Sequence, residues 1–150
     1  MSVKYILYNP LSCNGKGTEL AKKLAEIYKD DELKYCNMTQ ISGYGTFFDS
    51  ISPESDIVLC GGDGTLTRFI NDSDGYPYEN PLYYYGTGSG NDFLRDLGME
   101  QGCEPVRINE YVRNLPIVTV NGKSSRFINA IGYGIDGYCC EKGDELREKS

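Results

Sequence analysis

The most constraining feature of this chain is a repeated pattern: a short apolar run, a polar loop containing glycine, and then a helix pattern. Runs of this kind end near Tyr8, Cys60 and Tyr85. Strands that alternate with helices form a mostly parallel sheet covered by helices on both faces. Because ligand-binding loops of such sheets lie at the carboxyl ends of the strands, we expect these loops to share one edge. The sequence therefore predicts a three-layer α/β domain.

Apolar periodicity places the elements of this domain. Strands are predicted over residues 3–8, 33–38, 56–60 and 82–85, and helices over 43–51, 66–71 and 91–97. A further helix between the first two strands has apolar residues at spacings of three and four, which predicts one buried face. These residues are Leu20, Leu24, Ile27 and Tyr28.

The pattern changes after about residue 103. Strand-like runs over 106–108, 115–120 and 126–131 follow with no helix between them, and Asn121-Gly122 is a strong hairpin signal. We therefore predict an α/β domain over residues 1–103 and the start of a second, antiparallel β domain over 104–150. A sheet that stops at Ser150 would have unpaired edges, so the natural end of the chain is left open.

Composition narrows the class of protein. The net charge of −7 argues against a nucleic-acid-binding protein, because such proteins need a basic face to displace counterions from phosphate. No apolar run has the roughly 18 residues of a membrane span, and no signal peptide precedes the first strand. These features predict a cytoplasmic protein and leave peripheral contact with a membrane open.

Cysteine and histidine usage excludes further chemistries. The six cysteines have no C-x-x-C spacing, and the chain has no histidine. A zinc site is therefore not expected, and Ser-His-Asp or Cys-His catalysis is excluded from this chain. Reduced, mostly buried thiols are the simplest interpretation.

The strongest chemical signal is the loop Gly61-Gly62-Asp63-Gly64-Thr65, which follows a strand and opens a helix. Glycines let backbone N–H groups approach a phosphate, and a helix N-terminus adds unpaired N–H donors and a favourable dipole. A carboxylate at Asp63 fits this setting if it holds Mg²⁺, an ordered water or a nucleotide hydroxyl. The loop alone is equally consistent with a plain turn in which Asp63 caps its own helix.

Two other loops have a similar character. Residues 9–17 combine turn formers, a hydroxyl, glycine and lysine before a helix, but they lack the Walker A spacing, and an ordinary turn explains them more simply. Residues 86–91 are rich in glycine, and Asn91 or Asp92 could be an ordinary helix cap. Three such loops at one sheet edge are harder to explain as turns than any one of them.

Together these segments resemble the catalytic domain of the diacylglycerol kinase family. The motifs that carry the resemblance are Asn9-Pro10-x-Ser12, Gly61-Gly62-Asp63-Gly64-Thr65 and Gly86-Thr87-x-x-x-Asn91-Asp92-Phe93-x-Arg95. Residues 127–136 also resemble the family's entry into its second, β-sandwich domain, so the resemblance extends from about Val3 to Tyr138. The glycine-rich loop at 61–65 is shared with NAD kinases, whereas the Asn-Asp-Phe segment favours lipid kinases.

The resemblance implies an NAD kinase/diacylglycerol kinase-like fold and a kinase that binds ATP and Mg²⁺ between its two domains. The acceptor would be the hydroxyl of a lipid such as diacylglycerol at a membrane surface. Asp63 would lie near the metal, and the catalytic base would lie beyond residue 150, so this chain alone is expected to be inactive. The implied nucleotide-binding residues are Asn9, Pro10, Ser12, Thr39, Gly61, Gly62, Asp63, Gly64, Thr65, Thr67, Thr87 and Asn91.

Three departures from the family pattern bear on these assignments. Cys13 stands where the family usually has glycine, which predicts a stiffer first loop. Thr67 stands where asparagine is common, and Gly88-Ser89-Gly90 lengthens the loop before Asn91, which predicts a displaced Asn91.

Two alternatives to the lipid kinase stay open. One is an NAD-kinase-like enzyme with a soluble substrate, and the other is a non-catalytic nucleotide-binding module. The identity of the acceptor and the oligomeric state, including a homodimer, are not determined by the sequence.

Overall fold

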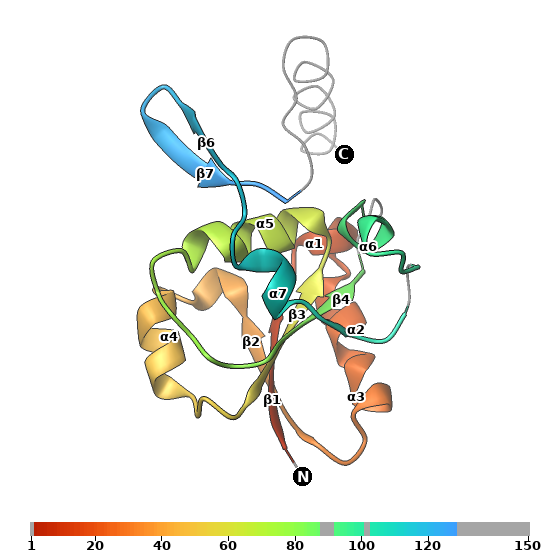
Figure 1. The fold of residues 1–150 in the computed structure, drawn as a ribbon. Coiled ribbons are helices and arrows are strands. Elements are labelled where there is room, and N and C mark those ends of the chain that lie inside the picture. Colours follow the sequence, from red (N-terminus) through yellow and green to blue (C-terminus); the bar gives the residue numbers. More distant parts are fainter. Residues whose placement is uncertain (1, 88–91, 101–102, 129–150) are drawn as a thin grey trace.

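A five-stranded sheet forms the centre of the protein, with strand order β2-β1-β3-β4-β5 (Figure 1). The structure is a computed structural model that describes residues 2–87, 92–100 and 103–128. Strands β1 to β4 are parallel, whereas β5 runs antiparallel to β4. The strands are β1 (Val3–Tyr8), β2 (Glu32–Asn37), β3 (Asp56–Gly61), β4 (Leu82–Gly86) and β5 (Val106–Arg107).

Helices cover both faces of this sheet, which confirms the predicted three-layer, mostly parallel α/β architecture (Figure 1). The helical elements are α1 (Ser12–Gly15), α2 (Gly17–Lys22), α3 (Leu24–Ile27), the 3-10 turn η1 (Met38–Gln40), α4 (Tyr44–Ser50), α5 (Asp63–Asp72), α6 (Asp92–Asp96) and α7 (Asn109–Val112).

Alternation along the strands creates two separate apolar layers, because neighbouring side chains of a strand point to opposite faces. On one face, Ile6 and Val58 pack with Ala21 and Leu24 of α2 and α3. On the other face, the core contains strand residues such as Leu7, Leu59 and Tyr84 together with side chains of α4, α5 and α6. The central strands are therefore buried on both sides, which holds their carboxyl ends in a fixed arrangement.

The helix expected between β1 and β2 differs from the prediction in one respect. Residues 17–27 form two short helices, α2 and α3, that meet at Lys23. Leu24 is fully buried as expected, but Ile27 is 37% exposed, so its placement on the buried face was wrong. Ile27 is the last residue of α3, where the chain leaves the sheet surface.

The strand predicted over 106–108 lies in the first sheet and not in a second β domain. Val106 and Arg107 pair with Tyr84 and Tyr83, and Ile108 is fully buried in the core beside α5. That part of the expectation was wrong, because a strand of two residues carries no periodicity from which its sheet could be inferred. The division of the chain at residue 103 stays a prediction.

The hairpin predicted from Asn121-Gly122 is present. Strand β6 (Ile117–Val120) pairs with β7 (Lys123–Arg126), and both turn residues have left-handed backbone, with φ of 52° and 78°. These angles are those of a two-residue type I′ turn. The return strand starts at Lys123, earlier than predicted, and the expected continuation to residue 131 extends outside the described residues.

The hairpin projects from the α/β body beyond α5 (Figure 1). Among the described residues, the helices are all too short or too polar to cross a lipid bilayer.

Candidate nucleotide-binding site

The glycine-containing loops begin side by side at the carboxyl edge of the sheet. The strand register places Tyr8 beside both Asn37 and Cys60, and Gly61 beside Gly86. The four parallel strands therefore end side by side. The segments that follow β1, β2, β3 and β4 lie at the same edge of the sheet. This is the edge at which parallel α/β sheets bind ligands.

Gly61 is fixed by close packing and by two hydrogen bonds. A Cβ at this position would lie 2.6 Å from the Cβ of buried Thr65, so the packing requires glycine. The Gly61 carbonyl accepts hydrogen bonds from the Thr87 backbone N–H (2.8 Å) and from the Tyr84 hydroxyl (3.2 Å). The start of the loop is therefore tied to β4 and held rigid.

The next turn of the loop is open. A Cβ on Gly64 would meet no atom within 4 Å. The first helical hydrogen bond of α5 is donated by Leu66 to the Gly62 carbonyl (3.1 Å), and no described group accepts from the backbone N–H of Asp63, Gly64 or Thr65. Unpaired N–H groups on a glycine-lined surface are the donors that a phosphate requires.

The Asp63 side chain reaches away from its own helix and caps α6. Its carboxylate accepts from the backbone N–H of Asp92 (2.8 Å) and of Phe93 (3.3 Å), one bond to each oxygen. The N-cap residue of α5 is Gly62, so no side chain caps the start of this helix. The alternative interpretation predicted that Asp63 caps α5, the helix that follows it. That prediction was wrong, because Asp63 caps α6 instead. A carboxylate can accept about four hydrogen bonds, and the described residues donate two to Asp63.

The first loop is a closed turn built from Asn9 and Ser12. The Asn9 carbonyl accepts from the Ser12 N–H (3.1 Å) and the Ser12 hydroxyl (2.8 Å), and the Asn9 side chain accepts from the Leu11 N–H (2.9 Å). Pro10 lies inside this turn. A Cβ on Gly17 would lie 1.9 Å from the Asn9 carbonyl oxygen, so only glycine allows the first turn of α2 to approach it.

Cys13 joins the first loop to the third. Cys13 and Asn14 both have left-handed backbone, with φ of 54° and 58°, a conformation that favours glycine. The Cys13 thiol donates to the Thr87 carbonyl (3.1 Å) and lies 3.6 Å from the Thr87 hydroxyl. Next to them, burial raises the pKa of the Cys60 thiol to about 12, so Cys60 stays neutral at pH 7.

The hydroxyls of Thr39 and Thr67 are already engaged within the protein. Thr39 follows β2 at the same edge, and its N–H (2.9 Å) and hydroxyl (2.6 Å) both donate to the Asn37 side chain. The Thr67 hydroxyl donates to the Asp63 carbonyl (2.9 Å) inside α5. A hydroxyl has one proton to donate, so in this structure both groups can offer a nucleotide only an acceptor. Asn91 and Gly88–Gly90 lie outside the described residues.

Two supporting residues were not found from the sequence. Asn37 holds Thr39, and its Asn-x-Thr spacing is a turn signal that could have identified it. Tyr84 binds the Gly61 carbonyl from the neighbouring strand, and no local pattern marks that contact. Burial raises the pKa of Tyr84, and nearby Asp63 raises it further, so its hydroxyl remains a donor.

Comparison with known families gives one match for this chain. The sequence model of the diacylglycerol kinase catalytic domain matches residues 4–120. The chain belongs to this family. The match includes the Asn9–Ser12 turn, the Gly61–Thr65 loop and the Asp92–Arg95 segment.

Comparison with individual proteins adds little beyond the family. Residues of this chain align with a crystal structure of a candidate diacylglycerol kinase from Bacillus anthracis str. Sterne, at 25% identity and a TM-score of 0.44. The aligned region is 67% of this chain and 38% of that protein, so the chain spans well under half of its relative's length. A search of curated proteins gave no match.

Proposed function

We propose that this family member is the nucleotide-binding part of an ATP- and Mg²⁺-dependent kinase that phosphorylates the hydroxyl of a lipid such as diacylglycerol. The observation that carries the proposal is the start of α5, where three backbone N–H groups without an acceptor among the described residues lie next to the Asp63 carboxylate. The N–H groups suit the phosphates, and the carboxylate suits a cation that accompanies them.

The proposed roles divide by chemistry. Asp63, Gly64 and Thr65 offer backbone N–H groups to the phosphates, while Asn9, Ser12, Thr39, Thr67 and Thr87 line the edge around the nucleotide. Gly61 and Gly62 keep the approach free of side chains. Asn91 is retained as a proposed contact from the family resemblance.

Asp63 fits a role next to Mg²⁺. No group of three or more metal-binding side chains gathers anywhere in the described part of the chain. Mg²⁺, however, usually keeps several waters and uses one or two carboxylates together with substrate phosphates. A single half-buried carboxylate with spare acceptor capacity matches that pattern. Bound there, Mg²⁺ would neutralise charge on the phosphates during transfer to the lipid hydroxyl.

Calorimetric titration of ATP with Mg²⁺ into this chain tests the nucleotide site. We expect Asp63→Asn to weaken binding in the presence of Mg²⁺ and to affect binding without Mg²⁺ much less, because it removes the charge but keeps an acceptor for α6. Asp72→Asn is the matched control, since it removes the same charge at the other end of α5, where Asp72 pairs with Arg68 and both side chains are exposed. Equal weakening by both variants would reject a local role for Asp63.

The acceptor is tested on the complete enzyme that contains this chain. Transfer of labelled phosphate from ATP is measured with diacylglycerol, a sphingoid base and NAD as competing acceptors. Labelled lipid phosphate is the expected product. Labelled NADP would instead establish the NAD-kinase-like alternative, and nucleotide binding without transfer to any acceptor would favour the non-catalytic module.

A further inference from the structure

A hollow lies at the opposite end of α5 from the glycine-rich loop. It has a volume of about 400 Å³. Its lining residues come from the end of α5, the segment after it, α7 and β7: Ile70, Ser73, Asp74, Gly75, Tyr76, Pro77, Tyr78, Asn109, Val112, Arg113 and Arg126. Asp63 and Asp72 are the two ends of this ten-residue helix, which corresponds to roughly 15 Å at 1.5 Å per residue. The hollow is therefore separate from the proposed nucleotide site.

The walls of this hollow combine apolar side chains with polar and charged ones, and several of them are held in place. Tyr78 packs against Phe48 with a ring-centroid distance of 4.6 Å. Buried Asn109 accepts from the Leu82 N–H (2.8 Å) and donates to the Asn80 carbonyl (3.0 Å), which fastens α7 to the sheet. The hollow is thus preformed, and its volume is at the small end of the range for ligand sites, about 300–1,000 Å³.

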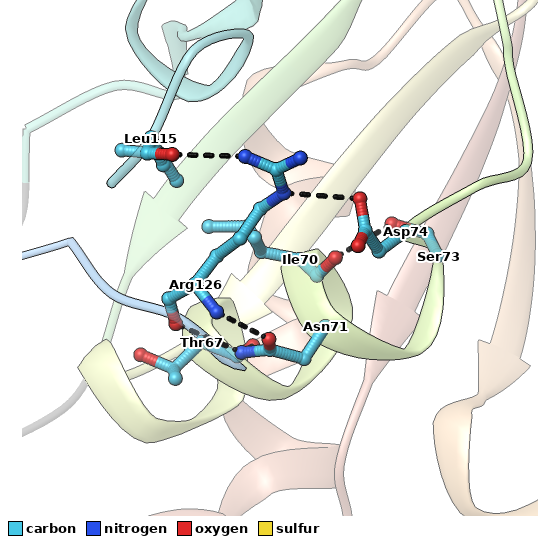
Figure 2. A network of polar contacts seen from close by, with 7 residues as sticks. All are labelled: Thr67, Ile70, Asn71, Ser73, Asp74, Leu115 and Arg126. Atoms are coloured by element: carbon cyan, nitrogen blue, oxygen red, sulfur yellow. Dashed lines mark hydrogen bonds and ion pairs between the residues drawn. The ribbon is translucent and has the colours of Figure 1, made fainter. Parts of the chain in front are cut away.

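One acidic group in the wall is already neutralised. Figure 2 shows the Arg126 guanidinium between Asp74 and Leu115: Nε donates to the Asp74 carboxylate (3.0 Å) and Nη1 to the Leu115 carbonyl (2.8 Å). The same residue is fixed through its backbone, which exchanges two hydrogen bonds with the Asn71 side chain (2.8 and 3.1 Å). The Asp74 charge therefore opposes an anion only weakly.

Two polar groups at the hollow have no partner among the described residues. Arg113 is exposed and forms no ion pair with any described carboxylate, and the Tyr78 hydroxyl makes no hydrogen bond with a described group. Both residues line the hollow, and the Arg113 charge lowers the pKa of Tyr78 while burial raises it. A guanidinium without a described carboxylate partner is notable in a chain whose net charge is −7.

We propose that this hollow binds a small amphipathic anion, with its apolar body among Ile70, Tyr76 and Val112 and its carboxylate or phosphate against Arg113 and Tyr78. A guanidinium and a hydroxyl supply donors for either anionic group. The apolar walls add affinity that a bare anion would not gain. The volume fits one medium-length chain and not a two-chain phospholipid. The site does not depend on the proposed kinase activity.

Nuclear magnetic resonance titration of the 150-residue chain tests the site with four probes below their micellar concentrations. Octyl phosphate and decanoate carry both features, decanol lacks the charge, and inorganic phosphate lacks the apolar body. With octyl phosphate or decanoate we expect shifts at the amides of Gly75, Tyr76 and Val112. Arg113→Gln should weaken binding by about tenfold, the effect of one charge-assisted contact worth roughly 1.4 kcal/mol. Tyr78→Phe should weaken it less.

The matched control is Arg68→Gln, which removes the same charge from the outer surface of α5, where Arg68 is exposed and pairs with Asp72. Unchanged affinity in that variant, with the loss in Arg113→Gln, supports the site. Equal losses in both variants would overturn it, because they would indicate general attraction to a cation. Decanol or inorganic phosphate binding as tightly as octyl phosphate would also overturn it. Shifts confined to the exposed hairpin residues Ile117 and Val120 would place the probe elsewhere. The relative affinity for octyl phosphate and decanoate shows which anionic group the site prefers.

Discussion

Each end of α5 binds the backbone of a distant segment, but the two ends use different side chains. At the first end, the Asp63 carboxylate accepts from two backbone N–H groups of α6, 29 and 30 residues away. At the other end, the Asn71 amide accepts from the Arg126 N–H and donates to the Arg126 carbonyl, 55 residues away (Figure 2). Each end of one helix therefore holds a distant segment by its backbone.

The difference lies in what remains after these bonds are made. The Asn71 amide group also donates to the Thr67 carbonyl (2.9 Å), so its donors and its oxygen are occupied. Asp63 has a charge and lone pairs to which no further described group donates, beside backbone N–H groups that no described residue uses. A neutral amide is sufficient to join two segments. A carboxylate strengthens its bonds to the N-terminus of α6 through its charge, and the same charge can also hold a cation. The Asn71 end of α5 is therefore a structural junction, whereas the Asp63 end is a candidate binding site.

The sharpest test of this contrast is Asp63→Asn in the proposed kinase. Asparagine keeps an oxygen for α6 but loses the charge, so we expect kcat to fall by more than about 100-fold, since a metal ion supplies several kcal/mol of charge stabilisation. The free energy of unfolding should fall by no more than about 1 kcal/mol, the usual value of a cap. Steady-state kinetics and urea unfolding measure the two quantities. Near-normal kcat would mean that Asp63 only joins two segments, as Asn71 does.

The glycines give a second test, at Gly17 and Gly64. Gly17→Ala places a Cβ 1.9 Å from the Asn9 carbonyl oxygen, and we expect a loss of about 3 kcal/mol in unfolding free energy because the backbone must move. Gly64→Ala meets open space and lies inside α5, so stability should be unchanged or rise by up to about 1 kcal/mol. Nucleotide binding should nevertheless weaken in Gly64→Ala, because the new methyl group stands in front of the phosphates.

Chemical denaturation and calorimetry of the two glycine variants measure these effects. The pair separates a glycine needed for packing from one needed for ligand approach. If Gly64→Ala binds nucleotide as tightly as the original chain, the open face over α5 is not where the phosphates lie.

Sequence reasoning succeeded here where the information is local. The four parallel strands and the turn at Asn121-Gly122 follow from apolar periodicity and turn chemistry within a few residues. The contacts of Asp63 with α6 and of Asn71 with Arg126 join segments far apart in the chain, and no local pattern distinguishes them from solvent-exposed polar residues. The pairing of Val106 with Tyr84 was missed for the same reason. Residues 106 and 107 form a strand because they lie beside β4, and their own sequence does not indicate this pairing.

A third test removes the junction at the far end of α5. Asn71→Ala leaves the Arg126 N–H and carbonyl without their partner, and we expect a loss of about 1–3 kcal/mol, the cost of partly buried groups left unpaired. Hydrogen exchange at Arg126 should become faster, while the amides of Asp92 and Phe93 at the other end keep their protection. Asp72→Asn is the control, with an expected change below about 0.5 kcal/mol because its ion pair is exposed. Faster exchange at both ends would show that the contacts at the two ends of α5 are not independent of each other.

The smallest effect is expected in the turn of the hairpin. Asn121 has a φ of 52°, which asparagine tolerates better than alanine, so Asn121→Ala should destabilise the turn by about 1 kcal/mol. The hairpin is attached to the body through Arg126 and not through its turn, so this cost should remain local. Hydrogen exchange should rise at Val120 and Lys123 and stay unchanged at Arg126. Asn121→Gly, which accepts the same backbone, should leave the pairing of β6 and β7 intact. If Asn121→Ala also speeds hydrogen exchange at Arg126, the turn and the α5 junction form one cooperative unit. The junction would then not depend on Asn71 alone.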